Sequence, residues 1–279
     1  MLSYRHAFHA GNHADVLKHA VLVLVLEYLK QKDKPLLFVD THAGAGRYDL
    51  TSPWAQKIGE FEGGIGRLLE CQPLPGELRA YVGLIKSLNR NQRLQCYPGS
   101  PWLAAELLRP QDRARLFELH PADFEPLGSL FRGDRRIKVE QQDGFKALPA
   151  LLPPAQRRAL VLIDPPYEVK QDYATVVRVL RAAWRRFPTG VYLLWYPVVR
   201  RASVERLERD LEVSGLRDVL LAELAVAPAG REGMQGSGLI IVNPPWTLKP
   251  QLQTLLAFLA DALGLQGQGS YRVEVLVEE

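Results

Sequence analysis

The tetrapeptide Asp164-Pro165-Pro166-Tyr167 places a carboxylate, a rigid backbone and an aromatic ring at four consecutive positions. It follows Leu160–Ile163, an apolar run that is typical of a buried strand. The carboxylate of Asp164 and the carbonyl of Pro165 can each accept a hydrogen bond from an exocyclic base amine, such as the N6 group of adenine. Those two bonds would draw the nitrogen toward a tetrahedral shape, so that its lone pair can attack a methyl-sulfonium.

The remaining residues of the tetrapeptide suit the same reaction. Two successive prolines restrict the backbone that aims the Pro165 carbonyl, and the ring of Tyr167 can stack on an extruded base. We therefore predict Asp164, Pro165, Pro166 and Tyr167 as the catalytic group, with Tyr167 also binding the substrate base. The alternative is a proline-rich turn between a strand and a helix that does no chemistry.

A Gly-rich loop earlier in the chain indicates where a cofactor would bind. The apolar run Leu36–Val39 leads into Asp40–Gly46, which has the spacing D-x-x-x-G-x-G. Glycine lets a backbone approach a ligand closely, so Gly44 and Gly46 are predicted to contact the cofactor. A dinucleotide fingerprint would need a third glycine, but Asp49 stands there. The loop therefore favours S-adenosylmethionine over a nicotinamide cofactor, with a plain tight turn as the alternative.

Acidic residues accompany the ends of two further strand-like runs. Glu118 closes the run Arg115–Leu119, and Asp143-Gly144 comes just after Ile137–Glu140. Because ligands bind at the carboxyl ends of parallel strands, these residues should converge with the Gly-rich loop. A carboxylate can accept hydrogen bonds from two ribose hydroxyls, which suits Glu118, or from an adenine amine, which suits Asp143. The alternative for each is a charge that faces solvent.

A second proline-rich motif, Asn243-Pro244-Pro245-Trp246, also stands at the end of a predicted strand. That strand is the last of the regular series, so it should lie far from the Gly-rich loop in the sheet. We therefore interpret the second motif as a structural turn rather than as a reaction centre.

The histidines gather near the start of the chain, where five of the six fall within the first 42 residues. His9 and His13 have the i, i+4 spacing that can hold a metal ion on a helix. No third ligand with suitable spacing is evident, so we predict no metal. The cluster is instead expected to form a polar cap over the cofactor site.

The apolar pattern predicts an α/β protein with a mostly parallel, seven-stranded sheet covered by helices on both faces. The expected strands are Leu36–Asp40, Arg115–Leu119, Ile137–Glu140, Leu160–Asp164, Gly190–Tyr196, Val219–Ala227 and Leu239–Asn243. The expected helices are 14–30, Trp102–Leu108, Tyr173–Phe187 and Ala202–Ser214. Ser100, followed by a proline, is predicted as an N-cap. Tyr271–Glu279 is either a further edge strand or a tail.

Residues 47–97 interrupt the first connection between a strand and its helix. They are polar and helical in tendency, with breaks at Gly63-Gly64, Pro73 and Pro75. Insertion at a loop costs little when the ends of the insert stay close. We therefore predict an inserted helical subdomain at 47–97, and a main domain made of 1–46 and 98–279.

The composition sets few limits on function. The 279 residues carry a net charge of +4, which permits a nucleic-acid partner without requiring one. Two cysteines and a longest apolar run of only Ala20–Leu26 predict a cytoplasmic protein that does not enter a membrane. Short basic runs that could bind phosphate are Arg132–Arg136, Arg157-Arg158, Arg185-Arg186 and Arg200-Arg201.

Taken with these motifs, the chain closely resembles the RlmJ family of bacterial 23S rRNA adenine-N6 methyltransferases, almost end to end. The resembling stretches are Met1–His6, His9–His19, Asp40–Tyr48, Tyr97–Pro101, Glu118–Pro121, Asp143–Phe145, Asp164–Glu168, Leu194–Val199 and Asn243–Trp246. The resemblance implies a Rossmann-like class I methyltransferase with a small helical insert. It also implies S-adenosylmethionine as the cofactor and one adenine of 23S rRNA as the target.

The resemblance assigns roles to particular residues as well. Those it implies to contact the cofactor are His19, His42, Ser100, Glu118, Asp143, Gly144 and Asp164. It implies that Asp164 is catalytic and that Tyr4 meets the target adenosine. To these we add Lys18, a cation suited to the methionine carboxylate of the cofactor.

Three other functions stay open at this point. The first keeps the chemistry and changes the substrate to adenine in DNA. The second is a catalytically silent RNA-binding assembly factor, against which the intact Asp164–Tyr167 argues. The third is a nicotinamide-dependent dehydrogenase, against which the missing glycine of the loop argues. Since no long exposed apolar helix is evident, we expect a monomer.

Overall fold

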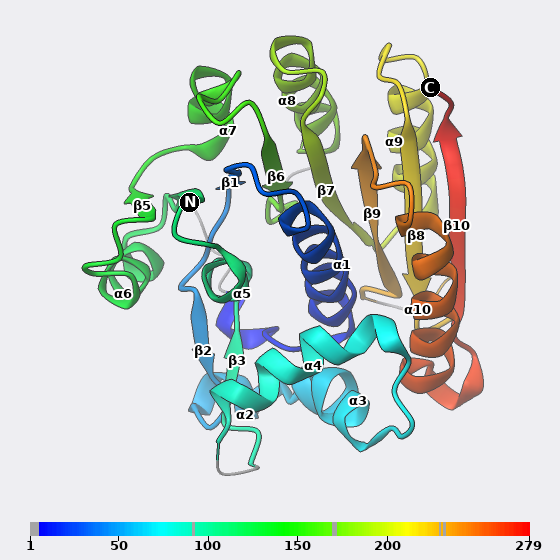
Figure 1. Cartoon of the computed structure of the whole chain (residues 1–279). Helices are drawn as coiled ribbons and strands as arrows, with labels where there is room; N and C mark the ends of the chain where they lie inside the picture. Colours follow the sequence, from blue (N-terminus) through cyan, green and yellow to red (C-terminus); the bar gives the residue numbers. More distant parts are fainter. Residues whose placement is uncertain (1–5, 91–92, 169–171, 229, 231–232) are drawn as a thin grey trace.

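The computed structural model describes residues 6–90, 93–168, 172–228, 230 and 233–279. Its centre is an eight-stranded sheet with helices on both faces (Figure 1). The strands of this sheet are β1 (Leu37–Asp40), β4 (Arg113–Phe117), β5 (Ile137–Glu140), β6 (Ala159–Ile163), β7 (Val191–Val198), β8 (Val219–Ala225), β9 (Gly236–Val242) and β10 (Ser270–Val277).

Seven of these strands match the seven predicted segments, with ends that differ by a few residues. The eighth, β10, is the segment for which an edge strand and a tail were both open. It pairs antiparallel with β8 along almost its whole length. The predicted count of seven strands is therefore corrected to eight, because Tyr271 and the residues after it extend the sheet.

Alternating side chains of the strands fill two hydrophobic cores, one on each face. On β6, Leu160 and Leu162 pack in the first core, whereas Ala159, Val161 and Ile163 pack in the second. Successive side chains of a strand point to opposite faces, and both faces here are covered. The continuous apolar runs that marked the strands in the sequence follow from this double burial.

Helices of the first face are α1 (His13–Lys30), α5 (Ser100–Leu107), α6 (Pro121–Leu130) and α10 (Leu248–Leu263). Those of the second face are α8 (Asp172–Arg186) and α9 (Arg201–Glu212). Shorter helical turns are η1 (His6–Phe8), α7 (Gly144–Ala147), η3 (Leu148–Leu151) and η4 (Leu265–Gly267). None of the helices in the described part of the chain is long and apolar enough to cross a membrane.

The order of the strands places the carboxyl ends of β1 and β6 side by side. The sheet runs β10-β8-β9-β7-β6-β1-β4-β5, and the five strands from β7 to β5 are parallel. From β1 the chain first builds toward β5 and then returns to β6, so the order reverses between β1 and β6. Open α/β sheets bind ligands at such a reversal, and Asp40 and Asp164 stand at these two strand ends.

The antiparallel strand β9 explains why the second proline-rich motif lies elsewhere. Because β9 runs antiparallel to β7, the carboxyl end of β9 lies next to the amino end of β7, away from the carboxyl ends of β1 and β6. There the side chain of Asn243 donates to the carbonyls of Pro188 and Gly190, which precede β7. The motif is therefore separated from the Gly-rich loop by the direction of β9 and not by a distant place in the sheet, and its interpretation as a structural turn stays a prediction.

The segment between β1 and α5 forms a two-stranded ribbon with helices between its strands (Figure 1). Its elements are β2 (Arg47–Asp49), α2 (Pro53–Ile58), η2 (Glu62–Gly66), α3 (Arg67–Glu70), α4 (Gly76–Leu88) and β3 (Cys96–Pro98). Pairing of β2 with β3 keeps the two ends of the segment together. Its apolar side chains share the first core with α1, so its separation as a subdomain at 47–97 stays a prediction.

Helix α5 begins differently from the prediction. Its N-cap is Gly99, and Ser100 is already the first helical residue, followed by Pro101. The side chain of Ser100 does not cap the helix, because it donates a hydrogen bond of 2.6 Å to Asp40. The expected capping role of Ser100 was therefore wrong, and its hydroxyl is used at the end of β1 instead.

Candidate active site

A cavity of about 700 Å³ opens at the carboxyl ends of β1, β4, β5 and β6. The predicted site residues that line it are Lys18, His19, His42, Gly44, Ser100, Glu118, Asp143, Gly144, Asp164, Pro165, Pro166 and Tyr167. Gly46 does not line it, because this glycine accepts a backbone hydrogen bond from Gly99 and faces Leu127 and Leu130. Tyr4 lies outside the described residues.

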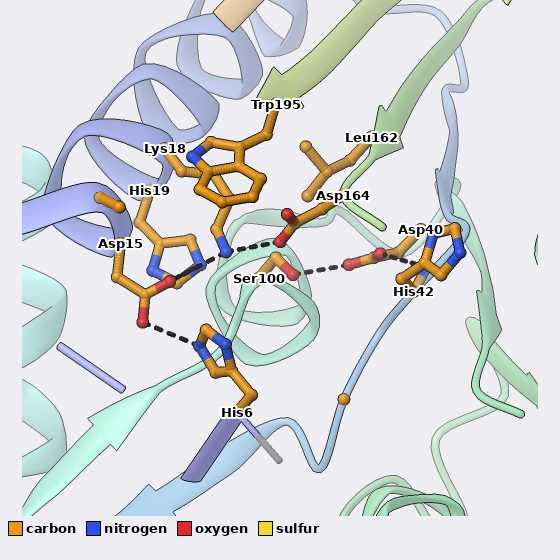
Figure 2. A network of polar contacts seen from close by, with 12 residues as sticks. His6, Asp15, Lys18, His19, Asp40, His42, Ser100, Leu162, Asp164 and Trp195 are labelled. Atoms are coloured by element: carbon orange, nitrogen blue, oxygen red, sulfur yellow. Dashed lines mark hydrogen bonds and ion pairs between the residues drawn. The ribbon is translucent and has the colours of Figure 1, made fainter. Parts of the chain in front are cut away.

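An ion-pair network joins α1 to the end of β6. The ammonium of Lys18 lies 2.6 Å from Asp164 Oδ2 and 2.9 Å from Asp15 Oδ1. Asp15 also contacts the ring of His6 at 2.9 Å, and the Lys18 ammonium lies 5.8 Å from the centroid of the Trp195 ring. Figure 2 shows Lys18 reaching between the two carboxylates below Trp195. Lys18 therefore holds one oxygen of Asp164, rather than standing as a free cation.

The second oxygen of Asp164 is left for another partner. Within the described part of the chain, no hydrogen bond reaches Asp164 Oδ1, and the side chain of Asp164 lines the cavity with 15% exposure. A carboxylate that is anchored through one oxygen has a fixed orientation. Asp164 thus offers the cavity an oriented acceptor.

Burial and charge oppose one another within this network. Burial alone would raise the pKa of Asp15, but the charges of His6 and Lys18 outweigh it and hold that pKa well below its usual range. Burial alone would likewise lower the pKa of Lys18, but Asp15 and Asp164 raise it well above its usual value. Asp15 and Lys18 are therefore both charged near neutral pH, and the charge of each stabilises the buried charge of the other.

The tetrapeptide ends in a strained residue that is fixed on both sides. Tyr167 has a φ of 52°, in the left-handed region that bulky residues seldom adopt. Its hydroxyl donates to the carbonyl of Trp195 at 2.7 Å, and its ring lies 4.7 Å from that of Tyr173. Strain of this kind persists only where the surroundings fix the residue, and it concentrates at functional sites. The ring of Tyr167 is thereby held against the cavity.

The end of β1 carries a buried carboxyl group. Asp40 accepts a hydrogen bond of 2.6 Å from Ser100 and one of 3.2 Å from the backbone N–H of His42. Burial raises the pKa of Asp40 to about 7, and the nearby charge of Asp164 adds to the rise. Asp40 therefore titrates near neutral pH while it fixes α5 against the Gly-rich loop.

Replacing Asp40 with asparagine should remove a pH-dependent part of the stability. Because the folded pKa of about 7 lies above the ordinary value of 3.8, the stabilising contribution is present below pH 4 and is lost as pH rises toward 7. The free energy of unfolding of the wild type, minus that of Asp40→Asn, should fall by up to about 4 kcal/mol over this window. Urea unfolding of both proteins from pH 4 to 8 measures the difference, and a flat difference would contradict the assignment.

Glu118 ties the Gly-rich loop to β4 and still has capacity to bind a ligand. It accepts from the backbone N–H of Gly44 at 2.8 Å and from that of His120 at 2.7 Å, one at each oxygen. A carboxylate has about four acceptor positions, so two are available to hydroxyl groups in the cavity. Burial raises the pKa of Glu118.

Close approaches of the backbone make a cradle near His42. A Cβ built on Gly144 would lie 2.1 Å from the carbonyl oxygen of Thr41, and one built on Gly44 would lie 2.2 Å from the Tyr48 hydroxyl. These two positions therefore require glycine. The ring of His42 lies 4.7 Å from that of Phe145, and burial lowers the pKa of His42 to about 4. The cradle thus presents a neutral imidazole.

A buried chain of hydrogen bonds links the cavity to the ribbon and to α4. His19 Nδ1 lies 2.8 Å from the hydroxyl of Tyr97, which lies 2.9 Å from the hydroxyl of Tyr81. Burial lowers the pKa of His19 to about 3, so the ring is neutral. His19 Nε2 is buried without a hydrogen-bond partner in the described structure. A buried polar atom of this kind calls for a partner, which a bound cofactor can supply.

Several residues of the site were not predicted from the sequence. Asp15 and Trp195 contact Lys18, and Tyr97 contacts His19. The spacing of Asp15 and Lys18 on one helix, i and i+3, was a signal for the first of these contacts. Trp195 and Tyr97 carried no such signal, because they reach the site from distant strands.

The polar groups of the cavity fit S-adenosylmethionine. Glu118 has free acceptor positions for a ribose. Asp143 uses Oδ1 to cap α7, and its Oδ2, which lies 3.5 Å from the exposed ammonium of Lys146, can still accept from an amine. His19 Nε2, which lies 3.9 Å from Asp15 Oδ1 and has no hydrogen-bond partner among the described residues, marks a third polar position. Among the described residues, no group of three His, Cys, Asp or Glu side chains is arranged to hold a metal ion.

The sheet order and the D-P-P-Y motif at its reversal define a Rossmann-like class I methyltransferase, a class whose methyl donor is S-adenosylmethionine. The family model described as "RsmJ: Ribosomal RNA large subunit methyltransferase D, RlmJ" matches residues 33–277. The chain therefore belongs to the RlmJ family of ribosomal RNA large subunit methyltransferases, as the sequence predicted.

Curated relatives and a solved structure agree with this membership. Ribosomal RNA large subunit methyltransferase J of Escherichia coli (strain K12) is 52% identical, and that of Haemophilus influenzae (strain ATCC 51907) is 50% identical. In both cases 100% of this chain and 100% of the relative are covered. A crystal structure of a protein from Legionella pneumophila has 40% identity and a TM-score of 0.90, and covers 96% of this chain and 98% of that one.

Proposed function

We propose that this protein transfers a methyl group from S-adenosylmethionine to the N6 amine of an adenine in 23S rRNA. The observation that carries the proposal is the carboxylate of Asp164, which lines the cavity with Oδ2 held by Lys18 and with no hydrogen bond to Oδ1 from the described residues. Membership of a ribosomal RNA methyltransferase family supports RNA as the substrate. We further propose that the protein acts as a monomer in the cytoplasm.

The cofactor is assigned to the part of the cavity between β1, β4 and β5. When bound, S-adenosylmethionine supplies an electrophilic methyl group. Glu118 accepts from the ribose hydroxyls, and Asp143 accepts from the adenine amine of the cofactor. Ser100, Gly44 and Gly144 shape the surrounding backbone, and their close contacts support this assignment.

Lys18 takes a different role from the one that its charge alone suggested. Its ammonium lies between Asp15 and Asp164, so we propose that it orients the catalytic carboxylate and does not itself bind the cofactor. We assign the methionine end of the cofactor instead to His19, whose Nε2 has no hydrogen-bond partner among the described residues. Both residues remain cavity-lining residues.

The residues at the end of β6 receive the target base. Asp164 Oδ1 and the carbonyl of Pro165 accept the two N6 hydrogens, and Tyr167 offers its ring for stacking. Bringing the base into the cavity requires that it leave its stack, at a cost of a few kcal/mol. The arrangement works mainly by positioning the amine. After transfer, the extra proton on N6 can pass to Asp164 or to water.

Replacing Glu118 with glutamine should weaken cofactor binding without slowing the chemical step. A hydrogen bond to a charged group is worth about 1.5–3 kcal/mol, so the Kd for S-adenosylmethionine should rise by about 10–100-fold. Titration calorimetry measures that Kd, while the rate at saturating cofactor should change little. Glu125→Gln, on the exposed side of α6, is the matched control. An unchanged Kd for Glu118→Gln would remove Glu118 from the cofactor site.

Methylation of DNA adenine is the nearest competing function, because Asp164–Tyr167 serves either nucleic acid. The test supplies labelled S-adenosylmethionine with protein-free 23S rRNA, single-stranded DNA or duplex DNA in parallel. We expect label in the RNA alone. Label in DNA at an equal or higher rate would replace the proposed substrate, and incorporation into none of them would favour a silent assembly factor.

A further inference from the structure

A second cavity lies at the amino ends of the strands, whereas the active site lies at their carboxyl ends. It has a volume of about 380 Å³ and is lined by the first residues of three strands, Leu37, Arg113 and Ile137, together with residues 150–151 and 153–156. The active-site cavity is lined instead by residues that follow the strands. The sequence had marked part of this lining as one of several short basic runs, and the proposed function does not use it.

The lining of this cleft is strongly cationic. Its charged residues are Arg113, Arg115, Arg135, Arg136 and Lys138, and none of its described lining residues is acidic. Five positive charges in one cleft repel each other unless negative charges compensate them. The degree of compensation therefore decides whether the cleft is a structural feature or a binding site.

Carboxylates outside the lining neutralise part of this charge. Glu140 pairs with both Arg115 and Lys138, and Asp134 pairs with Arg136. The two carboxylates that form ion pairs with these five cations leave an excess of three positive charges. Glu106 and Asp112 also act on Arg136 through their charges, but Asp112 is already paired with Arg109. Among the described residues, the side chain of Arg113 donates to the backbone carbonyls of Pro110 and Asp112 and to no carboxylate.

Arg135 is the cation of the cleft that is most available to a ligand. It is exposed, and within the described part of the chain no carboxylate forms an ion pair with it. Lys138 is 64% exposed, and its pairing with Glu140 is therefore a surface interaction of little energy. Both side chains can turn toward a ligand outside the cleft.

Strand β5 connects this cleft to the active site along one edge of the sheet. It is the last strand of the sheet and pairs with β4, and no described strand pairs with its other side (Figure 1). Lys138 near its start lines the cleft, and Gln142 just past its end lines the active-site cavity. Four residues of strand span about 13 Å. One RNA chain that follows this edge could therefore contact both cavities.

We propose that the cleft of Arg113, Arg135 and Lys138 binds the phosphodiester backbone of the RNA substrate, close to the target adenine. This inference rests on the proposed function. An exposed lysine on an edge strand can also prevent that strand from pairing with another molecule. That role would explain Lys138, but it would not explain the arginines that line the same cleft. The cleft fixes how the RNA lies across β5, while the active site reads the base.

The test removes two charges from the cleft and, separately, two from the far end of the sheet. Arg135→Ala/Lys138→Ala is the cleft variant. Its matched control is Arg206→Ala/Arg209→Ala on α9, where both arginines are exposed and the helix packs on β7 and β10. Binding of protein-free 23S rRNA is measured for both variants and the wild type at several salt concentrations. The KM for RNA, kcat and the Kd for S-adenosylmethionine are measured alongside.

Each lost phosphate contact lowers the salt dependence of log K by roughly 0.7–0.9. The cleft variant should therefore show a slope that is smaller by about 1.5, a higher KM for RNA, and an unchanged kcat and cofactor Kd. The control should match the wild type. A cleft variant with the slope and KM of the wild type would overturn the proposal. Failure of the wild type itself to bind or methylate rRNA would overturn the proposed function as well.

Discussion

Asp164→Asn should reduce methyl transfer to rRNA by about 10²–10⁴-fold, the range expected when a positioned acceptor that takes part in proton transfer is lost. The substitution keeps the size of the side chain. Lys18 would attract the amide oxygen of the new residue, because its ammonium lies 2.6 Å from Oδ2 in the wild type. The amide NH₂ would then face the cavity, where the N6 amine brings hydrogen-bond donors of its own.

The rate is measured under single-turnover conditions with labelled S-adenosylmethionine and saturating protein-free 23S rRNA. Cofactor binding is followed by calorimetry, since Asp164 was also predicted to contact the cofactor. A variant that binds the cofactor and transfers methyl at the wild-type rate would show that Asp164 is not the catalytic acceptor.

Lys18→Met should damage both stability and activity. The change leaves Asp15, of which the side chain is 1% exposed, and Asp164 without their shared counter-ion. Breaking a buried ion pair from one side costs about 3–5 kcal/mol. The rate should also fall by at least about 100-fold, because the carboxylate that receives the base loses its anchor. Urea unfolding and the methyl-transfer assay measure the two effects.

Lys30→Met, on the same helix, is the matched control. Lys30 forms a surface ion pair with Glu27 at 2.9 Å, with side chains 24% and 43% exposed. Such pairs contribute about 0–1 kcal/mol, so this variant should unfold and react almost as the wild type does. If Lys18→Met behaves like Lys30→Met, the network around Asp164 has no part in the reaction.

The sequence was sufficient to predict the sheet and the edge that carries the site. Apolar runs that are buried on both faces, as in β6, give a strong signal. Because ligands bind at the carboxyl ends of parallel strands, predicting β1 and β6 was enough to bring Asp40 and Asp164 together. Glu118 and Asp143 follow by the same reasoning, and the structure places both at the cavity.

Contacts that depend on three-dimensional packing were not predictable in this way. The partner of Lys18 is Asp164, 146 positions further along the chain, and nothing in the local spacing relates the two. Ser100 matched the sequence pattern of an N-cap, but its hydroxyl donates a hydrogen bond to the buried Asp40 instead. Gly46 matched the loop pattern, yet the turn at Gly44 directs it toward α6 and away from the cavity.

The measurement that tests the central claim most directly is the identity of the methylated nucleoside. Wild-type protein and Asp164→Asn are each incubated with S-adenosylmethionine and protein-free 23S rRNA, and the RNA is digested to nucleosides and analysed by mass spectrometry. We predict N6-methyladenosine from the wild type and almost none from the variant. Methylation at another atom or base, or equal amounts of N6-methyladenosine from both proteins, would contradict the proposed reaction centre.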